Sequence, residues 1–350
     1  MSAEPLTTAH DFPLAVDLDD TLLKVDTLYE NVAYNVFRHP FKTLHALMGL
    51  AGGKAAMKER LSKLDLPDAS TLPRDPDFID YLKAQKANGR SIHLVTAAHR
   101  TMATHIASDV GVFASAHGTD DQTNLKGTRK AEFLETTFPD GFVYAGDSSA
   151  DLHVWRKAEA AILVGVSETT QRTVETDKIK VETAFGAPKV NIAAAWLASL
   201  GLHRWLVILA ILGIVLFAIG AAGTVSTVTV FAGAFLLGCA ASGVFLTSEL
   251  AALETNRKNP SRRNRPFASG ALPVRDGLVA AVFLMGVAIA GSVFISPAFS
   301  GLMLLLVLVS LNGAFWFVTA PGIKQLMPIA QLALIGALSF VLIGTSMVGA

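Results

Sequence analysis

The chain has 350 residues and a formal net charge of zero, with 29 basic residues balanced by 29 acidic ones. This length accommodates about two domains. The balanced charge, without a basic patch interleaved with aromatic residues, excludes a nucleic-acid partner. The single cysteine, Cys239, excludes an internal disulfide and a cysteine metal site. The N-terminus lacks a basic start followed by an apolar core, so no signal peptide is expected.

The composition divides the chain into two parts. Residues 1–195 mix charged and apolar side chains as soluble domains do. After Trp205 the chain consists mostly of apolar runs of about twenty residues, which are long enough to cross a bilayer as helices. We therefore predict a soluble domain over residues 1–195 and an all-α transmembrane domain over residues 196–350.

The soluble part opens with a short apolar run at residues 14–16, which is typical of a buried parallel strand. Asp17 and Asp19 follow it, and residues two apart leave a strand on the same side. Two close carboxylates are stable only with a cation or a shared proton between them. Taken alone, the fragment is equally consistent with an acidic turn after a strand.

Three later segments of the soluble part supply polar residues of the same kind. An apolar run at 92–95 ends at a threonine, another at 142–146 ends at an aspartate, and a lysine precedes a predicted helix near residue 128. In an open parallel sheet, ligands bind beyond the carboxyl ends of the strands. The residues that we expect at this edge of one sheet are Asp17, Asp19, Thr96, Lys126, Asp147 and Asp151.

These segments, DLDDT, VTA, LKG and GDSSAD in that order, resemble the four motifs of the haloacid-dehalogenase-like (HAD) superfamily of phosphohydrolases. The resemblance covers residues 12 to about 166. It implies an α/β, Rossmann-like domain with a helical cap inserted at about residues 25–85, although two helices that merely cover the sheet would give the same pattern. A cap would close over the site and select the substrate.

The chemistry of phosphoryl transfer indicates a role for each acidic residue. Asp17 is placed to attack phosphorus and form an aspartyl-phosphate. Asp19 would protonate the leaving oxygen and later activate water. Asp17, Asp147 and the backbone carbonyl of Asp19 offer hard oxygen ligands suited to Mg²⁺.

The remaining residues of the motifs bind or orient the phosphate. Thr96 is expected to donate a hydrogen bond to a phosphoryl oxygen, and Lys126 to neutralise another, with Lys130 as the second choice for the lysine. Asp151 is expected to orient the lysine or the waters of the metal ion. His99 and Arg100, at the start of the next helix, are interpreted as solvated groups without a role.

The apolar half contains five predicted spans, at about residues 205–222, 227–247, 277–296, 301–320 and 329–348. The connection at 248–276 is rich in Lys and Arg, which favour the cytoplasmic side. This topology predicts an integral protein of the cytoplasmic (inner) membrane with its soluble domain in the cytoplasm. An odd half-bundle leaves interhelical surfaces that normally find a partner, so we expect a homo-oligomer.

Residues 201–278 resemble the UbiA family of membrane prenyltransferases, through HRWL at 203–206 and RRNRPFASGAL at 262–272. In place of the family's first aspartate-rich motif, this chain has Glu249, Ala252 and Asn256, and no aspartate follows Asp276. Prenyl transfer by this chain alone is therefore not expected. The basic loop is a candidate to bind lipid phosphate or equally an ordinary positive-inside loop; its residues are Arg257, Arg262, Arg263 and Arg265.

Three hypotheses for the function follow. The first is a membrane-anchored, Mg²⁺-dependent phosphohydrolase that acts on a phosphorylated small molecule, a prenyl phosphate or a prenyl-linked sugar phosphate. The second is a fused prenyltransferase-type protein whose transferase half depends on a partner or is inactive. The third is a non-catalytic membrane subunit that binds lipid or other proteins.

Overall fold

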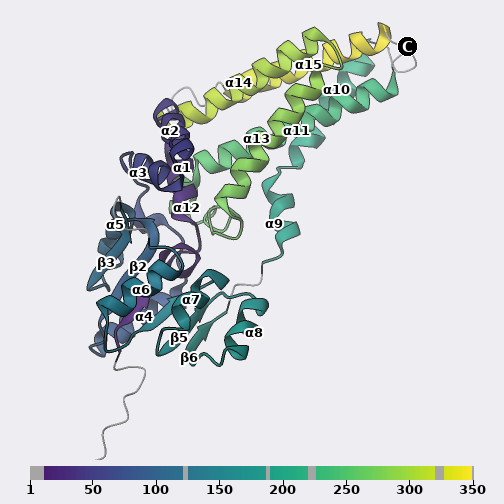
Figure 1. Ribbon diagram of the computed structural model, residues 1–350. Helices are drawn as coiled ribbons and strands as arrows, with labels where there is room; N and C mark the ends of the chain where they lie inside the picture. The colour runs from purple at the N-terminus through teal and green to yellow at the C-terminus, as the bar shows by residue number, and fades with distance from the viewer. Residues whose placement is uncertain (1–11, 121–124, 187–189, 220–225, 320–326, 349–350) are drawn as a thin grey trace, which may run out of the picture. The chain divides into compact units, whose positions relative to one another are not determined.

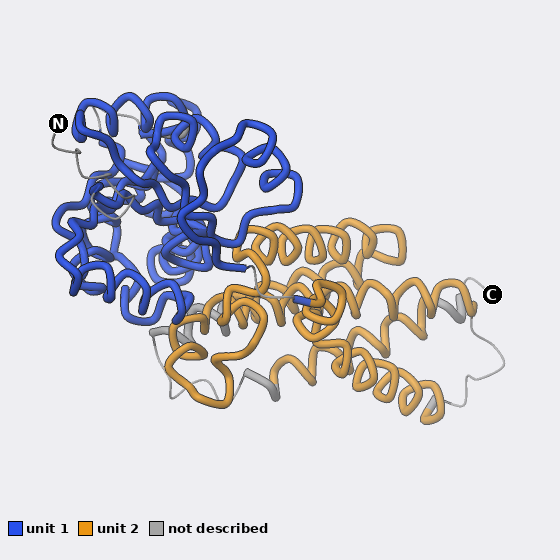
Figure 2. Tube along the Cα trace, turned by 90° about the horizontal axis from the view of Figure 1, so that it is seen from below, with its two compact units in different colours: residues 1–190 blue, residues 191–350 orange. Residues whose placement is uncertain are grey.

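The computed structural model describes residues 12–120, 125–186, 190–219, 226–319 and 327–348. The chain forms two compact units, residues 1–190 and residues 191–350 (Figure 2). This division lies five residues before the boundary expected from composition. The predicted N-terminal lead-in up to residue 11, Asn124 before the LKG motif, the loop at 223–225 and Lys324 lie outside the described residues.

A six-stranded parallel sheet forms the centre of the first unit, in the order β3-β2-β1-β4-β5-β6. Figure 1 shows β3 and β2 toward one side of this unit and β5 and β6 toward the other. Its central strand, β1, pairs with β2 on one side and with β4 on the other. The strand order reverses between β1 and β4, and in such sheets this is where ligands bind. The strands are β1 (Leu14–Val16), β2 (Ile92–His99), β3 (Ser115–Thr119), β4 (Val143–Gly146), β5 (Ala160–Val164) and β6 (Val181–Phe185).

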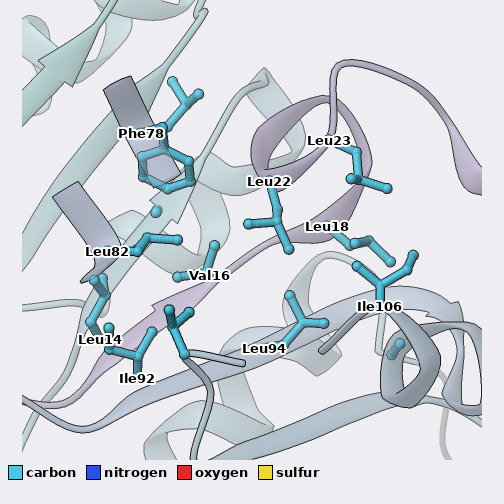
Figure 3. Close-up of a cluster of buried hydrophobic side chains, with 14 of the residues drawn as sticks. Leu14, Val16, Leu18, Leu22, Leu23, Phe78, Leu82, Ile92, Leu94 and Ile106 are labelled. Carbon is cyan, nitrogen blue, oxygen red and sulfur yellow. The ribbon is translucent and has the colours of Figure 1, made fainter. Parts of the chain in front are cut away.

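Five helices accompany the sheet: α4 (Pro76–Ala87), α5 (Arg100–Val110), α6 (Thr128–Thr137), α7 (Leu152–Trp155) and α8 (Glu168–Thr176). On one face, Leu14 and Val16 of β1 belong to a buried cluster with Phe78 of α4 and Ile106 of α5 (Figure 3). Successive strand residues point to opposite faces, so Ala15 belongs to the second cluster, with residues of α6 and α7. Helices on both faces thus bury the apolar strands, and the predicted α/β class is confirmed.

The helical cap is inserted between Leu23 and Arg74, which form an isolated antiparallel bridge. It consists of α1 (Thr27–Val36), α2 (Pro40–Met48) and α3 (Lys54–Ser62). Its own small core contains Ala46, Met57 and Leu61. Helix α4 lies outside the cap because Phe78 packs in the core of the sheet. The expected cap, at about 25–85, is therefore too long at its C-terminal end.

The structure contains two edge strands that the sequence does not reveal. Residues 117–123 and 169–189 read as polar connections, but the first includes part of β3 and the second contains α8 and β6. Both strands are short, and both lie at the edges of the sheet. An edge strand lacks the continuous apolar run of a central parallel strand, so its signal in the sequence is weak.

Among its described residues, the second unit contains helices joined by loops and no strands. Its helices are α9 (Ile192–Ser199), α10 (His203–Ile219), α11 (Thr227–Ala251), α12 (Leu253–Lys258), α13 (Val274–Ser292), α14 (Pro297–Thr319) and α15 (Met327–Val348). Five of these, α10, α11, α13, α14 and α15, coincide with the predicted spans. Among the described residues, α11 and α13 are long and apolar enough to cross a membrane. Helices α9 and α10, bent by 43°, form a third such segment when they are taken together.

Candidate functional site

The candidate site lies where β1 and β4 end, on both sides of the point at which the strand order reverses. Asp17 directly follows β1, and its backbone N–H donates to the carbonyl of Ala145 in β4 at 3.0 Å. Asp147 directly follows β4. Since both strands are buried and run parallel, their ends bring the two carboxylates to the same edge of the sheet. The structure therefore joins residues that are far apart in the sequence.

A buried lysine is paired with the first of these carboxylates. The Lys130 Nζ, on α6, lies 2.9 Å from Oδ2 of Asp17, and the Lys130 side chain is 5% exposed. Lys130 also donates to the hydroxyl of Tyr144 at 2.7 Å. Burial alone would lower the pKa of Lys130, but the Asp17 and Asp151 carboxylates outweigh it and raise this pKa. The lysine is therefore held charged beside Asp17.

Asp151 is fixed behind this pair. Its Oδ2 accepts from the backbone N–H groups of Asp147 and Ser148, at 3.2 Å each, and its Oδ1 accepts from the hydroxyl of Tyr144 at 3.0 Å. The approach depends on Gly146, because a Cβ there would lie 2.7 Å from the Asp151 carboxylate. With Lys130 Nζ 3.9 Å away, Asp151 is placed to orient the lysine and the loop after β4.

Three carboxylates form a group that can hold a metal ion. One ligand oxygen each from Asp17, Asp147 and Asp151 lies within 4.8 Å of the others. Burial, followed by the charges of Asp151 and Asp17, raises the pKa of Asp147 to about 8. Without a cation the protonated form of Asp147 is therefore favoured, and a divalent cation with a preference for oxygen ligands would favour its ionised form. The donor set fits a hard cation such as Mg²⁺.

Asp19 stands apart from this group and faces the cap. The chain after Asp17 makes a single π-helical turn, Leu18–Leu22, closed by a bond from the Leu23 N–H to the Leu18 carbonyl. Inside the turn, Asp19 has an extended backbone, and its Oδ1 accepts from the N–H of Thr27 at 2.8 Å, at the start of α1. Burial, and then the charge of Asp26, raise the pKa of Asp19 to about 7. At neutral pH this carboxyl can therefore both give and take a proton.

A partly open pocket with a cavity volume of about 30 Å³ adjoins Asp19. It lies between the cap and the ends of the sheet elements, and its polar lining includes Asn31 of α1, Lys58 and Ser62 of α3, and His99 at the end of β2. Lys58 Nζ donates to the carbonyl of Ala97 at 2.9 Å, which joins the cap to β2. The pocket therefore has apolar walls and several hydrogen-bonding groups next to a titratable carboxyl.

The two phosphate-binding residues expected from the sequence, Thr96 and Lys126, differ in burial and in their contacts. Thr96 is buried in β2, and its Oγ1 accepts from the N–H of Ala98 at 3.0 Å. Lys126 is exposed and takes part in no ion pair with the residues that the structure describes. Lys130, four residues later, occupies the place beside Asp17. The choice of Lys126 over Lys130 is thus not supported by the geometry, because Lys126 precedes α6, whereas Lys130 in the first turn of α6 reaches Asp17.

The sequence did not predict a role at the site for several residues. The hydroxyl of Thr21 donates to Oδ1 of Asp147 at 3.3 Å, and Tyr144 bridges Lys130 and Asp151. Tyr144 lies inside an apolar run and reads as a core residue. His99, interpreted as a solvated group, lines the pocket beside Asp19. Only the three-dimensional neighbours of these residues distinguish them from ordinary core and surface groups.

The basic loop of the second unit is largely occupied by internal contacts. Arg265 forms an ion pair with Glu249 of α11, and Arg257 Nε donates to the carbonyl of Ala268 at 3.0 Å. Arg262 and Arg263 are exposed. Glu249, at the position of the first aspartate in the UbiA-like alignment, therefore has an arginine partner within the described residues.

A second cavity, of about 280 Å³ and partly open, lies within the second unit among α10, α11, α14 and α15. Its lining is mostly apolar, with Arg204, Ser310 and Gln331 as its polar members. Gln331 Nε2 donates to the hydroxyl of Ser310 at 3.2 Å. This cavity contains no carboxylate, unlike the site at the end of the sheet.

No family model matches the chain. A curated protein of Sinorhizobium fredii (strain NBRC 101917 / NGR234), which carries the name uncharacterized protein y4nM, is 32% identical over 289 residues. The match covers 82% of this chain and 56% of that protein, so the chain spans little more than half the length of this relative.

Solved structures resemble about half of the chain. A substrate-bound phosphoserine phosphatase is 17% identical, covers 50% of this chain and 93% of its own, and has a TM-score of 0.35. A haloacid dehalogenase-like family hydrolase of Streptococcus pneumoniae is 14% identical, covers 51% of this chain and 94% of its own, and has a TM-score of 0.36. At such identities and TM-scores, neither likeness assigns an activity to this chain.

Proposed function

We propose that the first unit is a Mg²⁺-dependent phosphohydrolase that works through an aspartyl-phosphate on Asp17. The observation that carries the proposal is the arrangement around Asp17: a carboxylate at the end of the central strand, a buried lysine at 2.9 Å, and two further carboxylates within 4.8 Å. Asp19, whose pKa is raised to about 7, faces the adjoining pocket. This is the set of charges that phosphoryl transfer requires.

In the first step, a carboxylate oxygen of Asp17 attacks phosphorus, and the bond from phosphorus to the leaving oxygen breaks. Asp19, in its protonated form, gives its proton to that leaving oxygen. In the second step, water attacks the aspartyl-phosphate, its proton passes to Asp19, and inorganic phosphate and the Asp17 carboxylate are released. When bound, Mg²⁺ supplies positive charge for the nucleophile and the phosphoryl oxygens.

The other residues hold the phosphoryl group in line. Lys130 offers positive charge at the site, and the hydroxyl of Thr96 is a candidate donor to a phosphoryl oxygen. Asp17, Asp147 and the backbone carbonyl of Asp19 remain the proposed metal ligands. Asp151 has the hydrogen bonds of a residue that orients Lys130 and the loop after β4.

The apolar helices support anchoring of this enzyme in a membrane, with two to three segments long enough to cross it. The basic loop at 248–276 supports the cytoplasmic face of the inner membrane as the location of the first unit. That location favours a substrate with a phosphate at the membrane surface, such as a prenyl phosphate or a prenyl-linked sugar phosphate. A homo-oligomer remains part of the proposal.

The resemblance to UbiA supports a weaker alternative, a prenyltransferase-type fusion with an impaired or partner-dependent transferase half. Its diphosphate site would require the residues at 249, 252 and 256 to bind metal. Glu249 is paired with Arg265, and Ala252 has no ligand atom. The mostly apolar cavity among α10, α11, α14 and α15 is the feature of this unit that favours binding of a lipid.

The proposal is tested by phosphatase assays of the full chain in detergent. Hydrolysis of p-nitrophenyl phosphate and of an alkyl phosphate should require Mg²⁺ and disappear in Asp17→Asn. Asp20→Asn is the matched control, because Asp20 neighbours the site and has a φ of 58°, which asparagine also adopts readily. A folded, Mg²⁺-binding protein without turnover on either substrate would instead support the non-catalytic hypothesis.

A further inference from the structure

The outer face of the cap carries an unusual group of exposed apolar side chains. Among the described residues of the first unit, the exposed large apolar side chains other than Val181 all lie within residues 41–50. They are Phe41, Leu44, Met48 and Leu50, with exposed fractions of 86%, 59%, 65% and 53%. Exposed apolar side chains gathered in one place mark an interaction surface more often than scattered ones do.

Helix α2 places Phe41, Leu44 and Met48 opposite its packed face, and Leu50 follows in the short helix Gly49–Gly52. Thr43 and Ala46 are buried, and Ala46 belongs to the core of the cap. Phe41, Leu44 and Met48 are spaced three and four residues apart, so they project together from the other side of the helix. The apolar face is therefore additional to the one that folds the cap. We call Phe41, Leu44, Met48 and Leu50 the outer apolar face.

The surroundings of this face are basic. From residue 38 to residue 58 the sequence contains no Asp or Glu, and Lys42 and His45 lie on α2 itself. A hollow beside α2 is lined by Phe41 and Leu64 together with Lys42, His45, Arg60 and Lys63. Lys63 is paired with Glu59 at 2.5 Å, and the lining as a whole stays positive. This local charge contrasts with the zero net charge of the chain.

We propose that the outer apolar face of α2 docks on an anionic lipid bilayer. Apolar side chains above a basic surround are the features of a helix that lies in the membrane interface. A second copy of the chain would bring the same positive charges together, which opposes self-association through this face. The helices of the second unit that are long enough to cross a membrane would keep a bilayer within reach of the cap.

Docking would act on the site through α3. Lys58 and Ser62 of this helix line the pocket beside Asp19, and Lys58 joins the cap to β2. A cap seated in the interface would present that pocket to phosphates of the lipid surface. This consequence rests on the proposed function, whereas the docking itself does not.

The full chain in lipid nanodiscs provides the test. In a Cys239→Ser background, Leu44→Cys carries a fluorophore, and the discs contain lipids with a nitroxide quencher. Thr136→Cys on α6, which is also exposed, is the matched control. We expect several-fold stronger quenching at position 44 than at position 136 in discs of anionic lipid. Discs of zwitterionic lipid, or high salt, should reduce the quenching at position 44. Lys42→Gln should weaken docking about fivefold, the contribution of one basic residue at an anionic surface.

Three results would overturn the proposal. Equal quenching at positions 44 and 136 would mean that the face does not contact lipid. If a fluorophore at position 44 is protected from a water-soluble quencher equally in detergent and in discs, protein such as the second unit covers the face. Shielding in detergent that grows with protein concentration would identify a second copy as the partner. Hydrolysis by the labelled variants at the unlabelled rate verifies their fold, and loss of hydrolysis in Asp17→Asn leaves the quenching result unaffected.

Discussion

The positive charge of Lys130 balances the buried carboxylates of the site. Its Nζ lies 2.9 Å from Asp17 and 3.9 Å from Asp151, and Lys130→Met would leave these buried carboxylates without their cation. We expect the kcat/KM for phosphate ester hydrolysis to fall by on the order of 10²-fold or more, as when one charge-stabilising donor is removed from an active site. Lys126→Met is the matched control and should retain wild-type activity. The reverse ranking would reinstate Lys126 as the phosphate-binding lysine.

We expect Asp147 to lower the stability of the metal-free protein although hydrolysis requires it. Burial and the charges of Asp151 and Asp17 raise its pKa from 3.8 to about 8. Without metal, folding therefore takes up a proton between these values. The stabilisation is complete below the unfolded pKa and is lost as the pH rises through about 8. Asp147→Asn in EDTA should raise the free energy of unfolding above that pH by on the order of 1–3 kcal/mol, while hydrolysis is lost.

Calorimetry of the first unit's transition in the full chain checks this expectation as a function of pH. Mg²⁺ should stabilise the wild type much more than Asp147→Asn, because the variant lacks one of its ligands. An unchanged or lower stability of the metal-free variant across this pH range would contradict the account of a strained acidic cluster.

Among the single residues of the site, the sequence predicts those that directly follow strands. Asp17 and Asp147 could be predicted because a buried apolar run marks each strand and its end. Lys130 could not be ranked above Lys126, since both lysines lie close to the start of α6 and the sequence does not show which of them faces the sheet. The roles of Tyr144 and His99 depend on neighbours distant in the sequence, which no local pattern encodes.

Among the structural elements, β6 depends on a buried ion pair rather than on apolar alternation. Glu182 of β6 lies 2.7 Å from Arg90, with side-chain exposures of 6% and 3%, and accepts from the hydroxyl of Tyr81 at 2.6 Å. We expect Glu182→Gln to lower the free energy of unfolding of the first unit by about 3 kcal/mol, because it removes the carboxylate that balances the buried charge of Arg90. Asp80→Asn, which removes the exposed pair with Lys83, should cost less than about 0.5 kcal/mol.

Thermal unfolding of the two variants, followed calorimetrically, makes this comparison. Equal effects of the two substitutions would show that β6 is held by other contacts. The pair also explains why the strand is hard to foresee: Glu182 reads as a surface residue until Arg90, ninety-two positions earlier, is known to face it. Central strands such as β1 and β4 need no such partner, and their apolar runs suffice to predict them.

For the whole molecule, composition alone separates the two units to within five residues of the observed division. The five predicted spans overlap helices α10, α11, α13, α14 and α15, and their number as membrane spans stays a prediction. The membrane-crossing criteria are met among the described residues by α11 and α13, and by α9 with α10 as a bent pair. Helix α9 was not foreseen because its apolar run is short and ends before Gly201.

Trapping the phosphoryl group on the enzyme tests most directly whether Asp17 forms an aspartyl-phosphate. The full chain with Mg²⁺ and acetyl phosphate would be quenched in acid within a single turnover and mapped by peptide mass spectrometry. We expect one phosphoryl group on Asp17, which should accumulate further in Asp19→Asn because that variant cannot activate the water. Hydrolysis that proceeds at the wild-type rate in Asp17→Asn, or a phosphoryl group on another residue, would contradict this mechanism.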